Sequence, residues 1–161
     1  MARTVLVVCQ ANTARSVMAH ALLERLLEAR AAPGRVRVRS GGIAPYARDG
    51  MLASLDARLV LREEGIELAE DAFASTDLKQ HRELIAQADL ILTMTARQKE
   101  ALAAFAEAAG KPVFTLRGFS GEEGDIGDPA GQGEETFRAC RDEIKRCLEI
   151  SVDRLLALLA E

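Results

Sequence analysis

A cysteine and an arginine lie six positions apart near the start of this 161-residue sequence, separated by small and polar residues. Cys9 ends a stretch of β-branched and aliphatic residues, and Arg15 and Ser16 lead directly into an Ala- and Leu-rich segment. This order is typical of a buried strand, a tight loop and the first turn of a helix. Because an ionised thiol is a strong nucleophile, the pattern indicates a loop that carries out chemistry.

The predicted loop is suited to binding an anion. Its backbone N–H groups, the unpaired donors of the following helix and the positive end of the helix dipole would surround a negative charge. The same field favours a thiolate at Cys9, and the guanidinium of Arg15 matches two oxygens of a phosphate group. We therefore expect Cys9 to attack phosphorus. A buried strand-end cysteine is the alternative, but it leaves the arginine unexplained. The residues expected to bind phosphate are Gln10, Ala11, Asn12, Thr13, Ala14, Arg15 and Ser16.

A proton donor is expected on the long segment 117–133, which holds six glycines and four acidic residues. Transfer of a phosphoryl group to a thiolate needs an acid for the leaving atom and later a base for water. Asp128 is the best candidate because Pro129 restricts its backbone to extended conformations. The alternative is an ordinary turn within a solvated acidic loop. Other candidates on this segment are Glu122, Glu123 and Asp125.

Three polar residues are expected to support the thiolate. Ser16 can donate a hydrogen bond to the sulfur, and it is also a good residue for capping the helix. Asn12 is suited to a positive φ angle, since asparagine tolerates the left-handed region. Ser40 follows the alternating strand 35–39 and is expected close enough to hydrogen-bond Asn12, although an ordinary turn serine explains it equally well.

The remaining cysteines and histidines have weaker claims to a function. Cys140 and Cys147 lie seven residues apart on a predicted helix, so they share one face, where core packing is favoured over a redox pair. His20 can tune Cys9, but a half-exposed helical histidine is an equally good interpretation. Nothing around His81 indicates chemistry.

Strands that alternate with helices predict a three-layer α/β fold, in which a parallel sheet has helices on both faces and forms one domain over residues 1–161. The segment 35–39 alternates between arginine and valine, which predicts an edge strand. Pro33-Gly34 is expected to end the first helix, and Gly65 the second. The expected strands are 4–8, 35–39, 89–94 and 113–116, and the expected helices are 16–32, 49–64, 78–87, 97–109 and 134–160.

Ligands of such a sheet bind beyond the carboxyl ends of its strands. This rule places Cys9, Ser40, Thr95 and the segment 117–133 at the same edge. The site would therefore combine residues from both halves of the chain.

Composition narrows the class of protein. The net charge of −4 and pI near 5.4 argue against a general binder of nucleic acid or of anionic membranes. No signal-peptide or membrane-spanning pattern is present, and the three cysteines have no spacing typical of zinc sites or disulfide frameworks. A reducing cytoplasm is the expected location, because a working thiolate needs one.

Taken together, these motifs resemble the low-molecular-weight protein tyrosine phosphatase family. The resemblance extends over nearly the whole chain and is more specific than the Cys-to-Arg spacing alone. The matching segments are Cys9, Asn12, Arg15 and Ser16, Ser40-Gly41-Gly42, Glu64-Gly65-Ile66, the A-D-L-I-L-T-M of residues 88–94, and the D-I-G-D-P-A-G of residues 125–131.

The resemblance implies a four-stranded parallel sheet and a cysteinyl-phosphate intermediate at Cys9. It also implies phosphate binding by Arg15 and the loop amides, with Asp128 acting as general acid and then as general base. It implies no metal and no cofactor. The implied partners are phosphorylated protein substrates, and the implied assembly is a monomer or a weak dimer.

One branch of the family, the bacterial protein-arginine phosphatases, resembles the chain most. Thr13 stands where that branch has threonine and where tyrosine-directed members usually have an aliphatic residue, so it is the expected substrate-selecting residue. The T-L-R-G-F segment at 115–119 also resembles this branch. Tyrosine-directed members often have aromatic residues after the Asp-Pro pair, whereas this chain has Ala130 and Gly131.

The chain also departs from the family pattern. In the loop, Ala11 replaces the family's usual glycine and Ala14 replaces a second cysteine. In the first helix, Val17 replaces a proline and His20 a glutamate. After the Asp-Pro pair, Ala130 replaces an aromatic or bulky residue. These departures leave Cys9, Arg15 and Asp128 in place.

The favoured function is thus hydrolysis of phosphorylated protein side chains, phosphoarginine ahead of phosphotyrosine. The alternatives are arsenate reduction, with Cys140 and Cys147 as a relay, and a phosphate-binding module with weakened turnover.

Overall fold

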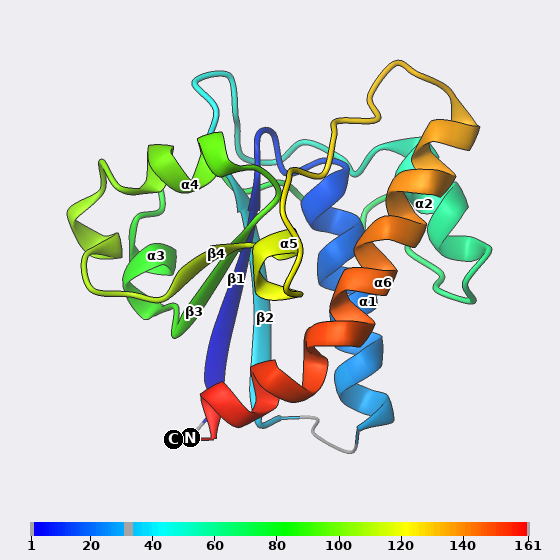
Figure 1. Cartoon of the computed structure of the whole chain (residues 1–161). Coiled ribbons are helices and arrows are strands. Elements are labelled where there is room, and N and C mark those ends of the chain that lie inside the picture. Colours follow the sequence, from blue (N-terminus) through cyan, green and yellow to red (C-terminus); the bar gives the residue numbers. More distant parts are fainter. Residues whose placement is uncertain (1, 31–33, 161) are drawn as a thin grey trace.

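The computed structural model describes residues 2–30 and 34–160 and contains a four-stranded parallel sheet. The strand order is β2-β1-β3-β4, so β1 and β3 are central and β2 lies at an edge. Figure 1 shows the strands running side by side in one direction. Their bounds are Arg3–Cys9 for β1, Val36–Gly42 for β2, Leu90–Thr93 for β3 and Val113–Thr115 for β4.

The burial of each strand agrees with its place in the sheet. Residues 4–9 of β1 are all buried, as expected for a central strand with helices on both faces. On β2, Val38 is buried between the exposed Arg37 and Arg39, which confirms the predicted edge strand with one solvated face.

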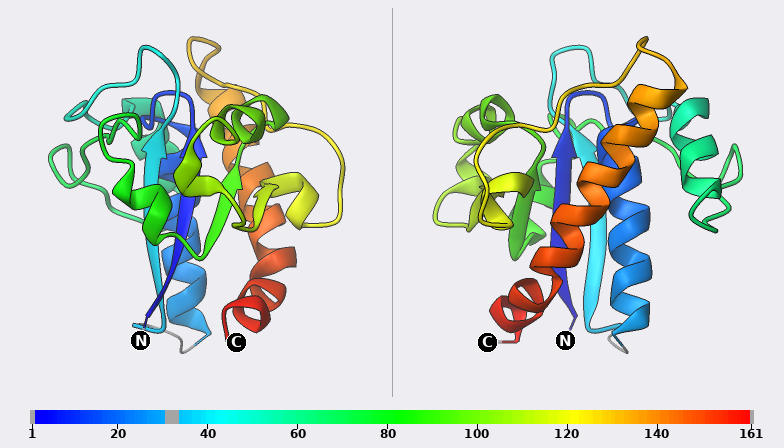
Figure 2. Two further views of the ribbon diagram at one scale, coloured as in Figure 1. Left: turned by 90° about the vertical axis from the view of Figure 1, so that its left-hand side faces the viewer. Right: turned by 45° about the vertical axis from the view of Figure 1, so that its right-hand side comes forward.

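Helices cover both faces of the sheet and form three layers, as predicted (Figure 2). One face packs Val5 and Val7 of β1 against one group of helices, and the other packs Leu6 and Val8 against a second group. The first group of helices comprises α1 (Arg15–Ala29), α2 (Leu55–Arg62), α5 (Leu116–Phe119) and α6 (Glu134–Leu159). The second comprises α3 (Glu83–Gln87), α4 (Ala96–Leu102) and the 3-10 helix η1 (Ala106–Ala108).

Several predicted helices are too long. The predicted helix 49–64 is replaced by α2, because the backbone of Gly50 and Met51 hydrogen-bonds to Ser75 and cannot make helical bonds. The predicted helix 78–87 shortens to α3, and the predicted helix 97–109 divides into α4 and η1, where an extended Phe105 packs towards the core. The first helix ends at Ala29, and the predicted stop at Pro33 lies outside the described residues.

The glycine-rich segment 117–133 has no helical or strand periodicity, which predicts a loop throughout, and this prediction is wrong at its start. It begins with the short helix α5, whose first turn is capped by the Thr115 hydroxyl, which accepts from Gly118 N at 3.0 Å. The rest of the segment, up to Gly133, is a loop that leads to α6. We call residues 120–133 the acid loop.

Ion pairs connect the end of helix α2 to α6. Both carboxylate oxygens of Glu63, which follows α2, accept hydrogen bonds at 2.7–2.8 Å from Arg138 and Arg141 of α6. These guanidinium groups lower the pKa of Glu63 to about 2. These bonds link the end of α2 to a segment that is remote in sequence.

Among the described helices, none is long and apolar enough to cross a membrane.

Candidate active site

The site is built on the loop between β1 and α1. Cys9 is the last residue of β1, and α1 begins at Arg15, so the predicted strand, loop and helix are confirmed. Asn12 takes a φ angle of 62°, the left-handed conformation expected for it. The loop therefore turns back at Asn12 and not at Ala11, where the resemblance would place a glycine.

The loop lies directly on the end of the neighbouring strand. A Cβ atom placed on Gly42 of β2 would lie 2.7 Å from the carbonyl oxygen of Gln10 and 2.8 Å from the carbonyl carbon of Ala11. Because real Cβ atoms do not approach backbone so closely, the glycine is required for the loop to occupy this position.

The sulfur of Cys9 is surrounded by hydrogen-bond donors. Its Sγ lies 2.9 Å from Ser16 Oγ, and the backbone N–H of Asn12 donates to it at 3.3 Å. Ser16 Oγ already accepts from Asn12 Nδ2 at 2.7 Å, so its own hydrogen can be directed at the sulfur. Both residues are fully buried. Two donors in a buried position suit a sulfur anion better than a neutral thiol.

The guanidinium of Arg15 connects this loop to the acid loop. Its Nη1 donates to the carbonyl oxygen of Ile126 at 2.7 Å, and its Nη2 lies 3.9 Å from Asp128 Oδ2. The arginine side chain is only 5% exposed, whereas that of Asp128 is 52% exposed. A buried guanidinium needs such partners, and here they orient its planar group within the site.

These residues meet in one pocket. The pocket has a volume of about 250 Å³ and is lined by Cys9, Gln10, Ala11, Thr13, Ala14, Arg15, Tyr46, Asp128 and Ala130. The expected thiol, guanidinium and carboxyl are thus brought together, although Asp128 is remote from the others in sequence. Such a pocket, with a nucleophile, a cation and an acid facing one space, is suited to phosphoryl transfer.

The structure distinguishes Asp128 from the other acids of its loop. Asp128 Oδ1 accepts from the backbone N–H of Ala130 at 3.0 Å, a local turn that holds the side chain in place. Asp125 accepts from Ala96 N at 2.9 Å, and Glu122 bonds Arg146, whose guanidinium lowers the pKa of that glutamate. Those two carboxylates therefore serve the fold.

Two of the expected supporting contacts are wrong. Ser40 Oγ lies 3.0 Å from His20 Nδ1 and does not pair with Asn12, whose Oδ1 accepts instead from Thr76 N at 2.9 Å. The reason is that Ser40 lies two positions before the end of β2, beside Val7, and faces α1. This contact also engages His20, so His20 is not a partner of Cys9.

Ser16 does not cap α1. The capping position is taken by Ala14, which has no side-chain hydrogen bond to the helix, and Ser16 lies within the first turn. Its hydroxyl faces the sulfur instead. The expected contact with the thiol is therefore confirmed and the expected cap is wrong.

Sequence reasoning missed Tyr46 as a pocket residue. It lies on the connection between β2 and α2 and is 62% exposed. The available signal was an aromatic residue in a loop after an edge strand, at the end of the sheet where ligands bind.

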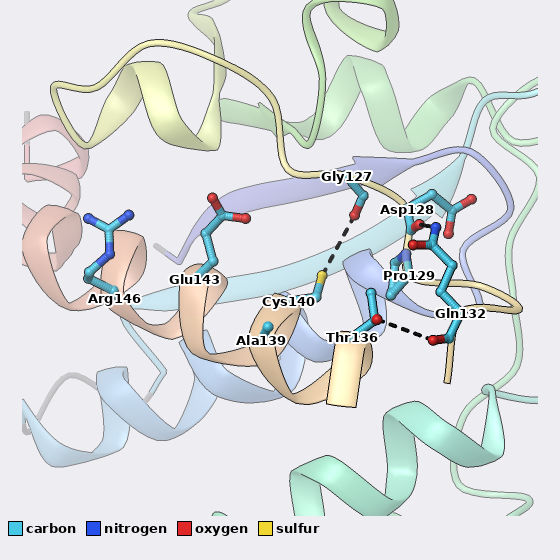
Figure 3. Close-up of a pocket in the computed structure, with 9 residues that line it drawn as sticks. All are labelled: Gly127, Asp128, Pro129, Gln132, Thr136, Ala139, Cys140, Glu143 and Arg146. Carbon is cyan, nitrogen blue, oxygen red and sulfur yellow. Dashed lines mark hydrogen bonds between the residues drawn. The ribbon is translucent and has the colours of Figure 1, made fainter. Parts of the chain in front are cut away.

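A second cavity, of about 590 Å³, lies between the acid loop and α6 (Figure 3). Asp128 lines this cavity as well as the pocket, and Cys140 points towards the carbonyl oxygen of Gly127, with its sulfur 3.8 Å away. Burial raises the pKa of Cys140 to about 12, and burial also raises the pKa of Cys147. Both thiols are buried on the helix face that packs on the core, as predicted. No group of three metal-binding side chains occurs among the residues described.

Comparison with known proteins identifies the family. The family model for low molecular weight phosphotyrosine protein phosphatases matches residues 4–159. A protein-arginine-phosphatase of Geobacillus stearothermophilus is 44% identical over 153 residues, which cover 94% of this chain and 92% of the relative. A probable low molecular weight protein-tyrosine-phosphatase, EpsP of Ralstonia nicotianae, is 35% identical, with 98% of this chain and 99% of the relative covered.

Solved structures agree with this match. The structure of a mutant YwlE arginine phosphatase with a phosphorylated active-site serine superposes with a TM-score of 0.83 at 33% identity, covering 96% of this chain and 95% of the other. Sequence, fold and comparison thus lead to one assignment: the chain belongs to the low molecular weight phosphotyrosine protein phosphatase family.

Proposed function

We propose that this chain is a cysteine-dependent protein phosphatase that hydrolyses phosphorylated side chains and prefers phosphoarginine. The observation that carries the proposal is the pocket in which the sulfur of Cys9, the guanidinium of Arg15 and the carboxyl of Asp128 face one space. The family and the named relatives support the same reaction class.

In the first step, the Cys9 thiolate attacks phosphorus. The P–N bond of phosphoarginine breaks as the S–P bond forms, and protonated Asp128 gives its proton to the leaving nitrogen. Arg15 and the amides of residues 10–16 stabilise the charge that gathers on the phosphoryl oxygens. The products are the substrate protein with an unphosphorylated arginine side chain and a cysteinyl phosphate.

In the second step, Asp128 acts as the base. It removes a proton from water while the water oxygen attacks phosphorus, and the S–P bond breaks. Ser16 then donates its hydrogen bond to the departing thiolate, which lowers the energy of this leaving group. Inorganic phosphate leaves. Asp128, which lost a proton in the first step and gained one from water in the second, is protonated again, and Cys9 is again a thiolate.

The proposed preference for phosphoarginine rests on two residues of the pocket. Thr13 and Ala130 line it, and both are smaller or more polar than the residues that would grip a phenyl ring. The protein-arginine-phosphatase relative supports the same choice. Phosphotyrosine is the second candidate, because Tyr46 also lines the pocket and can stack on an aromatic ring, and because one relative is named a tyrosine phosphatase.

Arsenate reduction is less well supported. A disulfide relay would need Cys140 and Cys147 to reach the surface, whereas both thiols are buried on one continuous helix and burial raises the pKa of each. Loss of a measurable arsenate-reductase rate in the Cys140→Ser, Cys147→Ser double variant would revive this function. A silent phosphate-binding module would instead bind vanadate tightly without releasing product.

The test is hydrolysis of matched phosphoarginine and phosphotyrosine peptides, with Cys9→Ser as the blank. We expect kcat/KM to favour phosphoarginine by about tenfold or more, which corresponds to about 1.4 kcal/mol of transition-state free energy. The Thr13→Ile variant should reduce this ratio by lowering the phosphoarginine rate. Activity that survives Cys9→Ser would refute the mechanism, and a ratio unmoved by Thr13→Ile would remove Thr13 as the selecting residue.

A further inference from the structure

Four exposed apolar side chains occur on one segment beside the pocket. They lie on the connection from β2 to α2 and on the first residue of α2. The remaining two large apolar side chains of comparable exposure in the described residues lie on α6. We call the first group the apolar rim, which consists of Tyr46, Met51, Leu52 and Leu55, exposed by 62%, 41%, 50% and 61%.

The apolar rim is continuous with the catalytic pocket. Tyr46 lines the pocket directly. At the other end of the segment, the N–H of Ser54 donates to the carbonyl oxygen of Thr13 at 2.8 Å, so Leu55 directly follows a residue bonded to the pocket wall. Figure 1 shows this connection at the same end of the sheet as the loop after β1. The segment that carries the apolar rim is thus in contact with the pocket at Tyr46 and, through Ser54, at Thr13.

The backbone beneath the apolar rim is ordered by hydrogen bonds on its other side. Met51 N donates to Ser75 Oγ at 2.9 Å, Ser75 N donates to Met51 O at 2.9 Å, and Leu52 pairs with Ala74 in an antiparallel bridge. The exposed side chains are therefore presented by a fixed backbone. A partner that binds such a pre-ordered surface loses less conformational entropy than one that must first order a loop.

Exposed apolar side chains concentrated on one segment indicate an interaction site, because covering them removes apolar surface from water. A phosphorylated side chain in the pocket brings its neighbouring residues to the rim. An extended chain advances about 3.3–3.6 Å per residue, so residues two or three positions away reach about 7–11 Å from the entrance. This range suits contacts with side chains that adjoin the pocket wall.

We propose that the apolar rim binds apolar residues flanking the phosphorylated side chain of a protein substrate. The inference rests on the proposed function, since it assigns the rim to the substrate of the same site. It makes the enzyme selective for sequence context: peptides with leucine or a similar residue near the phosphorylated position are hydrolysed more efficiently than polar ones. A second copy of this chain is the competing occupant, and the rim's continuity with the pocket favours the substrate.

The experiment compares two phosphopeptides that differ only in flanking leucines or serines, together with p-nitrophenyl phosphate, which has no flanking residues and whose ring can contact only Tyr46 of the rim. The Leu52→Ser, Leu55→Ser double variant is expected to lose about tenfold in kcat/KM on the leucine peptide, mainly through KM, because ground-state and transition-state binding fall together. Its kcat/KM on the serine peptide and on p-nitrophenyl phosphate should stay within about twofold of wild type.

The matched control is the Ile150→Ser, Leu158→Ser double variant, which removes two exposed apolar side chains of α6 and should leave the peptide preference unchanged. Equal losses on all three substrates, or no loss on the leucine peptide, would overturn the proposal. So would a dimer that dissociates in the Leu52→Ser, Leu55→Ser variant while its peptide preference stays that of wild type, as measured by sedimentation velocity.

Failure of the proposed function would be recognised separately. In that case wild type hydrolyses neither peptide, and fluorescence anisotropy then measures binding of both peptides to wild type and to the rim variant. Tighter binding of the leucine peptide that disappears in the rim variant would support the rim, and equal binding would overturn it.

Discussion

Adding one methyl group to the end of β2 should disable the proposed site without unfolding the chain. In the Gly42→Ala variant, the new Cβ would lie 2.7 Å from Gln10 O and 2.8 Å from Ala11 C, both backbone atoms of the loop that follows Cys9. Ordinary van der Waals contact begins at 3.4 Å, so the shortfall is 0.6–0.7 Å. Either the loop or the strand must move by about this amount.

The expected loss of activity follows from that displacement. A misplacement of about 1 Å at a reacting centre can cost about a hundredfold in rate. We therefore expect kcat/KM of Gly42→Ala on a phosphorylated peptide to fall by about tenfold to a hundredfold. Overpacking of this kind costs about 1–3 kcal/mol of folding free energy, which lowers Tm by roughly 2–12 °C for a chain of this size. Calorimetry and steady-state kinetics measure the two effects separately.

Gly41→Ala is the matched control. Its Cβ would lie 2.5 Å from side-chain carbons of Leu78, so the same substitution one position earlier pushes a core side chain and not the loop. We expect a comparable fall in Tm with kcat/KM within about threefold of wild type. If the two variants lost stability equally and kept equal activity, the loop would not depend on its close approach to Gly42, and the reasoning would be refuted.

Three further predictions follow from the site and its surroundings. Asp128→Asn removes the proposed proton donor and should lower kcat/KM by about 10²- to 10⁴-fold, with a smaller loss on p-nitrophenyl phosphate, whose leaving group needs less protonation. Two arginines of α6 lower the pKa of Glu63 from 4.5 to about 2. Its carboxylate therefore stabilises the fold above pH 4.5 and loses this effect as the pH falls towards about 2, so Glu63→Gln should flatten the decrease in Tm over that range. Burial raises the pKa of Cys140 to about 12 and raises that of Cys147, so iodoacetamide at neutral pH should modify Cys9 alone, as measured by peptide mass spectrometry.

Each of these has a clear contrary result. Equal losses of kcat/KM on poor and good leaving groups would show that Asp128 does not protonate the leaving atom, because kcat/KM excludes the second step, in which Asp128 acts as the base. A Glu63→Gln variant with the wild-type acid profile would show that its ion pairs contribute no pH-dependent stability. Modification of Cys140 before Cys9 would contradict the raised pKa of Cys140, and protection by phosphate should be confined to Cys9.

Neighbouring residues alone were enough to predict part of the site. The sequence placed Cys9 just after a strand and Arg15 just before a helix, each within one residue of the observed end, because the aliphatic run and the Ala- and Leu-rich segment have different periods. The left-handed turn at Asn12 is likewise a local property of that side chain. The edge position of β2 followed from its alternating arginines and valines.

Contacts between remote segments had to be read from the fold. The sequence favoured Asp128 among four acids of one segment only because Pro129 follows it. The fold brings Asp128 to 3.9 Å from Arg15, while Asp125 and Glu122 have partners elsewhere. The partner of Ser40 was mistaken for the same reason. Strand periodicity fixes which face a side chain takes but not which residue of a packed helix meets it there.

The ends of the helices also depend on contacts between remote segments. Residues 49–54 were predicted as helix, yet the backbone of residues 50–52 pairs with Ala74 and Ser75, which also fixes the backbone that carries the exposed apolar side chains. Local preferences of a few tenths of a kcal/mol per residue are outweighed when several backbone hydrogen bonds to another segment compete. The chemistry of the loop from Cys9 to Ser16 can thus be predicted from the order of its own residues. The positions of Asp128, of the apolar rim and of Gly42 against the loop depend instead on which distant segments pack together.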